Sequence, residues 1–278
     1  MPGKLNARNN HGTGNLKILF IGDIIGRIGR RTVRALLPKT VDYYKVDFVI
    51  ANGENLAGGF GITRNTAQEV FDLGVDVITT GNHVWDKKEA LRLVDEEPRI
   101  LRPANYPKAQ VPGRGAGIYE KNGCKIGVLN LIGRLFMDAY DDPFRIADEH
   151  ISWMREKADI LFVDFHGEAT SEKQAMGHYL AGRVSAIVGT HTHVQTSDEK
   201  IMKGHTAYIS DVGMVGPADS IIGLNKDEAL KRFLTKIPHR FVEVGGGTGV
   251  MNSVIVDVDE KTGKTTDITR LNLSHSDV

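Results

Sequence analysis

The sequence predicts an α/β fold, and three observations indicate it. Short, continuous apolar runs recur along the chain, which is the pattern of strands buried on both faces. Segments with apolar residues at helical spacing lie between several of these runs, as in parallel β-α-β units. Polar side chains follow directly after five of the runs, at the positions where strands would end.

The first half of the chain alternates predicted strands with predicted helices. Strands are expected at residues 17–21, 46–50 and 75–79, and helices at residues 27–44 and 63–71. Thr63 is a favourable N-cap for the second helix, and Gly74 is a favourable stop after it. Residues 99–114 are rich in Pro and polar side chains and are expected to form a long loop.

The second half adds antiparallel pairing to this pattern. Asn122-Gly123 is a strong hairpin signal between strands expected at residues 116–119 and 125–131. Ser171 and Gln174 fit a capping box that opens a helix ending at Leu180. The remaining expected elements are helices at 143–157 and 225–236, and strands at 160–163, 184–188, 207–209, 241–244, 250–258 and near residue 268. Residues 245–247 are interpreted as a hairpin turn.

Composition limits the class of protein and its partners. The chain has 278 residues, 41% of them hydrophobic, and its Lys+Arg and Asp+Glu totals are equal at 35. Zero net charge argues against extended nucleic-acid binding, which requires a basic excess. No uncharged apolar run reaches the roughly 18 residues of a membrane span, and the single cysteine, Cys124, forms no internal disulfide. These features predict a soluble, cytoplasmic protein.

The domain prediction is a single unit behind a short extension. Residues 1–15 are polar and rich in Gly and Asn, and they lack the apolar stretch of a secretory signal. They are expected to form a flexible N-terminal extension. No repeat or linker divides residues 16–278, so these residues are expected to form one domain.

The polar side chains at the five strand ends are the main functional signal. They are Asp23; Asn52, Glu54 and Asn55; Asn82 and His83; Asp164, His166 and Glu168; and His191 and His193. The carboxyl ends of parallel strands lie along one rim of an α/β sheet, which is where ligands bind. The fold would therefore gather groups that are far apart in the sequence.

Each group has an ordinary structural interpretation when it is considered alone. Asp23 is more often a cap or turn residue than a ligand, and His166 could be a satisfied buried histidine. The pair His191 and His193 is better evidence, because this spacing at a strand end directs both rings to one side. Together the groups favour a metal site. Serine-based hydrolysis is disfavoured, because no G-x-S-x-G motif occurs and no serine lies at these strand ends.

Carboxylate, amide and imidazole ligands without thiolate suit Mn, Fe, Zn or Ni. The ligands outnumber those that one ion with an open position requires, so two ions are predicted, with Glu54 able to bridge them. Fe and Mn are the leading candidates, and Zn, Ni and Mg are alternatives. Asp86, Asp164 and Glu168 are candidates for orienting the imidazoles, although acidic residues near strand ends often only cap helices.

The order of these motifs resembles the calcineurin-like metallophosphoesterase superfamily. The matching segments are Gly22-Asp23-Ile24-Ile25, Asn52-Gly53-Glu54-Asn55, Gly81-Asn82-His83, Asp164-Phe165-His166 and Thr190-His191-Thr192-His193. Two departures occur: Ile25 stands where that superfamily usually has a metal-binding His, and Glu54 replaces the usual Asp. Both departures are similar to those of a bacterial branch, the YmdB-like 2′,3′-cyclic nucleotide phosphodiesterases.

The resemblance implies a calcineurin-like four-layer sandwich of two mixed β-sheets flanked by α-helices. It also implies that Asp23, Glu54 and His193 hold one ion, with Asn55 in the space left by the missing His. Glu54, Asn82, His166 and His191 would hold the second ion, and His83 would face the substrate. Without an imidazole at position 25, the first ion is expected to be held less tightly.

The expected activity is hydrolysis of small phosphodiesters, with 2′,3′-cyclic nucleotides as the favoured substrates. The hypothesis is in-line attack by a hydroxide shared between the ions, with His83 as general acid for the leaving oxygen. The alternatives are a phosphomonoesterase, a hydrolase of another phosphodiester, and a regulatory or scaffolding protein with a structural metal site. A homo-oligomer is expected from the resemblance alone. Trp85 and Phe60 could stack on a base, although loop aromatics more often pack against their own loop.

Overall fold

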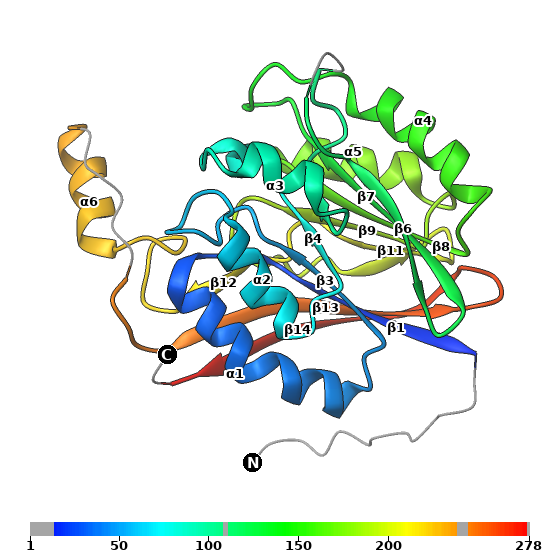
Figure 1. Ribbon diagram of the computed structural model, residues 1–278, viewed down its shortest axis with the longest axis horizontal. Helices are drawn as coiled ribbons and strands as arrows, with labels where there is room; N and C mark the ends of the chain where they lie inside the picture. The colour runs from blue at the N-terminus through cyan, green and yellow to red at the C-terminus, as the bar shows by residue number, and fades with distance from the viewer. Residues whose placement is uncertain (1–13, 108–110, 238–243, 277–278) are drawn as a thin grey trace.

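A computed structural model describes residues 14–107, 111–237 and 244–276 of the chain. Two β-sheets lie face to face, and helices cover the outer face of each sheet (Figure 1). The helices are α1 (Gly26–Tyr44), α2 (Arg64–Asp72), α3 (Ala90–Glu96), α4 (Pro143–Arg155), α5 (Thr170–Leu180) and α6 (Lys226–Thr235), with a 3-10 turn η1 (Asn82–Trp85).

The first sheet is mixed and has eight strands in the order β2-β12-β13-β1-β3-β4-β5, with β14 paired to β13. Its strands are β1 (Asn15–Ile21), β2 (Asp23–Ile24), β3 (Phe48–Asn52), β4 (Val77–Thr79), β5 (Ile100–Leu101), β12 (Met214–Pro217), β13 (Gly249–Asp259) and β14 (Thr265–His275). β1, β3, β4 and β5 are parallel, whereas β13 runs antiparallel to β1, β12 and β14.

The second sheet has six strands in the order β10-β11-β9-β8-β7-β6. They are β6 (Ala116–Lys121), β7 (Cys124–Ile132), β8 (Ile160–His166), β9 (Ala186–Thr190), β10 (Lys200–Met202) and β11 (Thr206–Ile209). The four central strands are parallel, and antiparallel strands β6 and β10 close the two edges. Both sheets are therefore mixed, as predicted.

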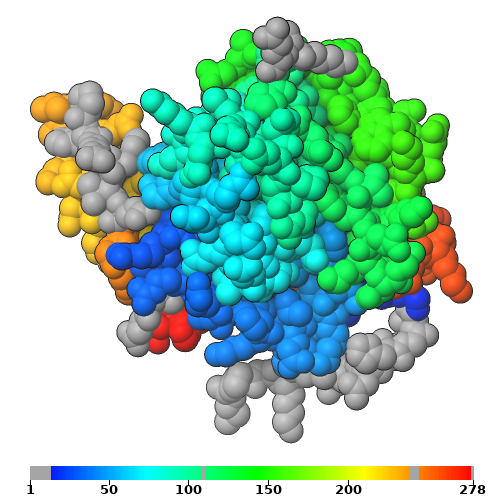
Figure 2. All heavy atoms as spheres, in the orientation of Figure 1, coloured from blue at the N-terminus to red at the C-terminus, as the bar shows by residue number. Residues whose placement is uncertain are grey.

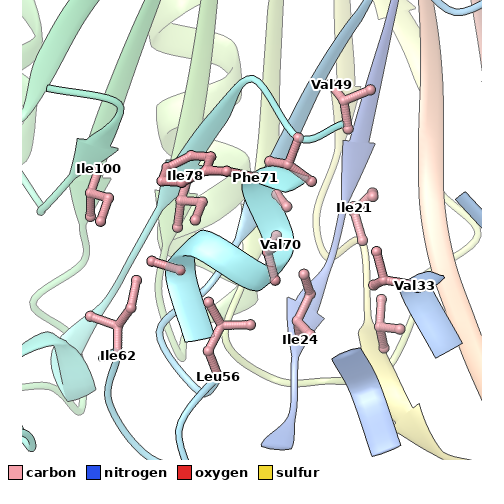
Figure 3. Packing of buried hydrophobic residues seen from close by; sticks show 14 of the residues in the cluster. Ile21, Ile24, Val33, Val49, Leu56, Ile62, Val70, Phe71, Ile78 and Ile100 are labelled. Carbon is pink, nitrogen blue, oxygen red and sulfur yellow. The ribbon is translucent and has the colours of Figure 1, made fainter. Parts of the chain in front are cut away.

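Three layers of apolar side chains hold the sandwich together. Alternate side chains of β1 belong to different layers: Ile18 and Phe20 point between the sheets, while Leu19 and Ile21 point towards the helices. Between the sheets, the rings of Phe20 and Phe162 stack with centroids 5.6 Å apart. On the outer faces, α1, α2 and α3 pack on the first sheet, and α4 and α5 pack on the second. Figure 3 shows Val33 of α1 and Val70 and Phe71 of α2 among the apolar side chains of the first sheet. Three apolar interfaces define four layers, which confirms the predicted sandwich.

Local sequence signals explain several boundaries. Thr63 caps α2, and its hydroxyl accepts from the backbone N–H of Thr66. The hairpin between β6 and β7 turns at Asn122 and Gly123, both of which have positive φ, as a two-residue type I′ turn requires. Asn225 caps α6 through its side-chain oxygen.

Other expectations were wrong. The capping box at Ser171 and Gln174 does not form; the N-cap of α5 is Ala169, two residues earlier, and it makes no side-chain cap hydrogen bond. The first turn of α5 instead buries the side chains of Glu172 and Lys173. The expected loop at 99–114 contains the short strand β5, and α3, β2, β10 and β12 were not predicted.

Three expectations concern segments at the limits of the described chain. Most of the strand expected at 241–244 lies outside the described residues, and residues 245–247 lead into β13. Asn15 is already the first residue of β1 and pairs with Asp259, while residues 1–13 lie outside the described residues. The division into an extension and one domain stays a prediction. In the described part of the chain, no helix has the length and apolarity needed to cross a membrane.

Candidate metal centre

The carboxyl ends of the parallel strands of both sheets meet at one edge of the sandwich. β1 runs from right to left in Figure 1, so this edge is on the left of that view. Asp23, Glu54 and Asn82 come from the first sheet, and His166 and His191 come from the second. All five predicted strand ends contribute side chains to this edge.

Two groups of side chains there could each hold a metal ion. Glu54, His166 and His191 form one group, and Asp23, Glu54 and His193 form the other. The ligand atoms of each group lie within 4.8 Å of one another, and Glu54 belongs to both groups. The edge therefore contains two adjacent groups of candidate ligands that share one carboxylate.

Short distances connect the first group. His166 Nε2 lies 3.0 Å from His191 Nδ1, 3.1 Å from Asn82 Oδ1 and 3.3 Å from Glu54 Oε1. In the second group, His193 Nε2 lies 3.9 Å from Asp23 Oδ1 and 3.4 Å from Asn55 Nδ2. Asn55 thus lies beside the group of Asp23 and His193. Asn82 lies beside the group of His166 and His191.

In each of these three histidines, the ring nitrogen that faces away from the ligand group (the outer nitrogen) has an oxygen partner. Nδ1 of His166 lies 2.9 Å from Thr190 Oγ1, and the Thr190 hydroxyl donates to Asp164 Oδ1, so that hydroxyl accepts from the ring N–H. His191 Nε2 lies 3.1 Å from Glu168 Oε2. The Nδ1–H of His193 donates to the Ile222 carbonyl at 2.9 Å. When the rings are neutral and these outer nitrogens donate, the inner nitrogens present their lone pairs to the site.

Some polar atoms at this edge have no hydrogen-bond partner among the described residues, and a bound cation would satisfy them. Asp23 Oδ1 and Asn55 Oδ1 are buried and have no hydrogen-bond partner among the described residues. Gly81 provides the necessary space, because a Cβ there would collide with Glu54 Oε2 and His166 Nε2. Converging lone pairs and orphaned oxygens are costly when buried, and a metal ion compensates them.

The electrostatics of the cluster lead to the same conclusion. Burial raises the pKa of Asp23 to about 6, although His193 and His166 oppose the change. Burial also opposes ionisation of Glu54, but the neighbouring His166 outweighs it and lowers the pKa of Glu54 to about 2. Burial disfavours charge on His166, yet Glu54 and Asp23 raise its pKa to about 9. The carboxylates therefore favour positive charge at this point, which either a proton or a metal ion supplies.

His83 belongs to neither ligand group. Its Nδ1 lies 2.8 Å from Asp86 Oδ2, and its backbone N–H donates to Glu54 Oε2. About a third of its side chain is exposed, and its ring contacts Phe60 edge-on at 5.0 Å. Trp85 packs against Tyr106 at 5.8 Å. Phe60 and Trp85, the rings expected to be able to stack on a base, therefore each contact another ring of the protein.

Ile25 lies where the resemblance places a histidine. Its side chain is buried, and a Cβ at Gly223 would collide with it. Ile25 therefore packs against the turn that contains Gly223, and the imidazole expected at this position has no substitute there. Asn55 Nδ2 lies 3.4 Å from His193 Nε2 and is a polar side chain beside this group.

Sequence reasoning missed several residues that support the centre. Asp164 was considered, but its partners Thr79, Thr190 and Asn52 were not recognised. Asp211 and Lys173 form a buried ion pair beside the loop of His191 and His193. Asp211 follows the end of β11, so it carried the same signal as the five strand ends that were used. The burial of Lys173 had no sequence signal.

This architecture and this centre define a member of the calcineurin-like metallophosphoesterases. The chain belongs to the family of YmdB-like proteins, whose sequence profile matches residues 19–271. It is 46% identical over 256 residues to a 2′,3′-cyclic-nucleotide 2′-phosphodiesterase of Bacillus subtilis, covering 92% of this chain and 96% of that protein. A putative phosphatase/phosphodiesterase of Mycoplasma genitalium is 36% identical over 268 residues, covering 93% of each.

Solved structures support the same family. The crystal structure of a phosphatase from Mycoplasma pneumoniae has a TM-score of 0.89 at 33% identity, covering 96% of this chain and 95% of that one. A hypothetical protein from Thermus thermophilus has a TM-score of 0.87 at 41% identity, covering 94% and 100%. A putative 5′-nucleotidase of Staphylococcus aureus, 16% identical with a TM-score of 0.60, shares the fold over 92% of this chain and 54% of that one.

Proposed function

We propose that the protein is a metal-dependent phosphodiesterase that hydrolyses small phosphodiesters, with 2′,3′-cyclic nucleotides as its substrate class. The observation that carries the proposal is the pair of ligand groups that share Glu54. The similarity to the Bacillus subtilis phosphodiesterase over nearly the whole chain supports the choice of substrate.

The proposed ligand assignment follows the two groups. Asp23, Glu54 and His193 would hold one ion, with Asn55 beside it. Glu54, Asn82, His166 and His191 would hold the other. Rotating the Asn55 amide by 180° would turn its orphaned Oδ1 towards His193 and Glu54, where an ion can use it. When bound, two such ions supply an activated water and offset the charge on the phosphoryl oxygens.

The proposed role of His83 is to deliver a proton. Its Nδ1 faces Asp86, which orients the ring and leaves Nε2 as the atom that protonates the leaving ester oxygen. The partial exposure of the side chain allows it to reach a substrate above the centre. In a 2′,3′-cyclic phosphate, water adds to phosphorus, one ring P–O bond breaks, and the released ribose oxygen takes the proton.

Fe and Mn are the proposed metals, because carboxylate, amide and imidazole ligands suit both; Zn, Ni and Mg remain alternatives. The group of Asp23 and His193 has one imidazole, whereas the group of His166 and His191 has two. We therefore expect the ion beside Asp23 to exchange first on chelation.

Phosphomonoester hydrolysis is a second candidate activity. The solved relative from Mycoplasma pneumoniae is described as a phosphatase, and the Mycoplasma genitalium relative as a phosphatase/phosphodiesterase. The same centre can serve either reaction, because an in-line displacement at phosphorus needs the same charge stabilisation in both.

The proposed assembly is a homo-oligomer. α6 stands at one edge of the molecule (Figures 1 and 2), and three large apolar side chains at helical spacing on it are exposed, Leu230, Phe233 and Leu234, as is Ile237 just after its left-handed C-cap. An apolar stripe of this kind is typical of an interaction surface. Light scattering on the purified protein tests this expectation, and cell fractionation tests the predicted cytoplasmic location.

Hydrolysis of 2′,3′-cyclic AMP, bis-p-nitrophenyl phosphate and p-nitrophenyl phosphate by one metal-quantified sample tests the activity. The proposal predicts that the two diesters are hydrolysed, that activity disappears on chelation, and that Mn restores it with about two ions per chain. Turnover of the monoester alone would favour the phosphatase. No turnover of any ester at full metal occupancy would contradict both.

A further inference from the structure

The loop that carries His191 and His193 has an unusual backbone. φ is 103° at His191 and 65° at His193, in the left-handed region that residues other than glycine rarely adopt. Such residues persist only where surrounding contacts fix them, and they cluster at functional sites. The contacts of this loop therefore show what holds the two imidazoles in place.

Thr192, between the two histidines, is fixed by one carboxylate. Asp211 Oδ2 accepts from the backbone N–H of Thr192 at 3.0 Å and from its hydroxyl at 2.7 Å. Asp211 Oδ1 accepts from the backbone N–H of Gly213 at 2.8 Å. The carboxylate thus ties the histidine loop to the segment that follows β11.

Lys173 completes the environment of this carboxylate. Its Nζ lies 2.6 Å from Asp211 Oδ2, and both side chains are only 2% exposed. Its methylene stem runs alongside Gly189, near the end of β9. A buried ion pair is expensive to desolvate and adds little net stability, so its presence beside a strained loop calls for another role.

We propose that the buried Lys173–Asp211 pair, acting through Thr192, holds His191 and His193 in the geometry that binds the two metal ions. Lys173 and Asp211 are positioning residues, because the proposed ligands are other side chains. The inference rests on the metal-dependent function proposed above, and it adds the support that makes the two imidazoles converge.

Two variants weaken the support without removing a proposed ligand. Thr192→Val removes the hydroxyl that donates to Asp211 while keeping the size of the side chain, and Lys173→Met removes the buried ammonium while keeping its stem. Thr192→Ser is the conservative control, because it keeps the hydroxyl. Lys17→Met is the control for losing an ion pair elsewhere, since the partly exposed Lys17 pairs with Asp257 at 2.7 Å, away from the centre on β1.

The measurement is Mn affinity of each purified protein by competition with a chelating dye, with thermal unfolding of the metal-free protein in parallel. Thr192→Val and Lys173→Met are expected to weaken Mn binding by about 10–100-fold, as loss of a ligand-orienting contact does. Thr192→Ser and Lys17→Met are expected to bind Mn like the wild type.

Wild-type affinity in both Thr192→Val and Lys173→Met would overturn the proposal. An equal loss in Lys17→Met would also overturn it, because general destabilisation would then explain the effect. If Lys173→Met does not fold, Thr192→Val against Thr192→Ser decides. A wild-type protein that binds no Mn, Fe or Zn would instead overturn the function on which the inference rests.

Discussion

Glu54 Oε1 lies 3.3 Å from His166 Nε2, and both side chains are almost completely buried. The contact joins the two sheets, because Glu54 follows β3 of the first sheet and His166 ends β8 of the second. It also lies where the two ligand groups meet, since Glu54 belongs to both. The loss of this one carboxylate should therefore affect both proposed ions.

Glu54→Gln is expected to lower the affinity of both ions by more than about 100-fold, because a ligand is lost and not merely its support. Metal analysis after dialysis should find well below one ion per chain. Glu69→Gln is the control, since Glu69 lies on α2, pairs with Arg30 of α1 and belongs to neither ligand group. Retention of two ions by Glu54→Gln would exclude a bridging role.

His83→Ala is expected to lower kcat on 2′,3′-cyclic AMP by a factor of about 10²–10⁴, because the general acid is lost. Metal content should stay unchanged, since His83 lies outside both ligand groups. Bis-p-nitrophenyl phosphate should be much less affected, because its leaving group departs without a proton. Equal losses on both substrates would argue that His83 binds the phosphate and does not act as the acid.

Metal-free protein is expected to lose stability as the pH rises from about 6.5 to 9. The pKa of His166 is raised to about 9 in the folded chain, against the opposing effect of burial, by Glu54 and then Asp23. A raised histidine pKa gives stability that is complete below the unfolded value of about 6.5 and is lost as the pH passes the folded value. The difference corresponds to at most about 3 kcal/mol.

Calorimetry of the metal-free protein across this range checks the sign. The buried Asp164, whose pKa burial raises to about 7, acts in the same direction at lower pH, because its ionisation opposes folding. His166→Gln should flatten the dependence between pH 6.5 and 9. A metal-free protein that becomes more stable over that range would show that the carboxylates do not favour charge on His166.

Much of this centre could be predicted from the sequence, because its ligands follow strands whose apolar runs are easily recognised. Asp23, His166 and His191 gather where the parallel strand ends predict. The pairing of β13 with β1 and the short strand β12 could not be predicted, because they depend on contacts between distant segments. The same holds for the burial of Lys173, because its partner Asp211 lies 38 residues further along the chain.

The capping box at Ser171 shows the opposite failure. The local pattern was favourable, but Glu172 is turned inward, where its carboxylate accepts from the backbone N–H groups of Arg134 and Leu135. With those contacts and the burial of Lys173, α5 starts two residues earlier than the local signal indicates, because its N-cap is Ala169 and not Ser171. The tertiary contacts of these two buried charged side chains therefore outweigh the N-cap preference of Ser171, which contributes about 1 kcal/mol to helix stability.

Gly81→Ala tests whether the space at the centre matters as much as its ligands. The φ of Gly81 is −146°, outside the left-handed region that favours glycine. The Cβ of alanine would nevertheless collide with Glu54 Oε2 and His166 Nε2 and separate them. We expect loss of most bound metal and of activity, measured on one sample by metal analysis and diester hydrolysis. Gly245→Ala is the control, because a Cβ there meets nothing within 4 Å. If Gly81→Ala keeps both ions and full turnover, the close approach of Glu54 and His166 is not needed for metal binding. The proposed ligand assignment, which depends on that approach, would then be wrong.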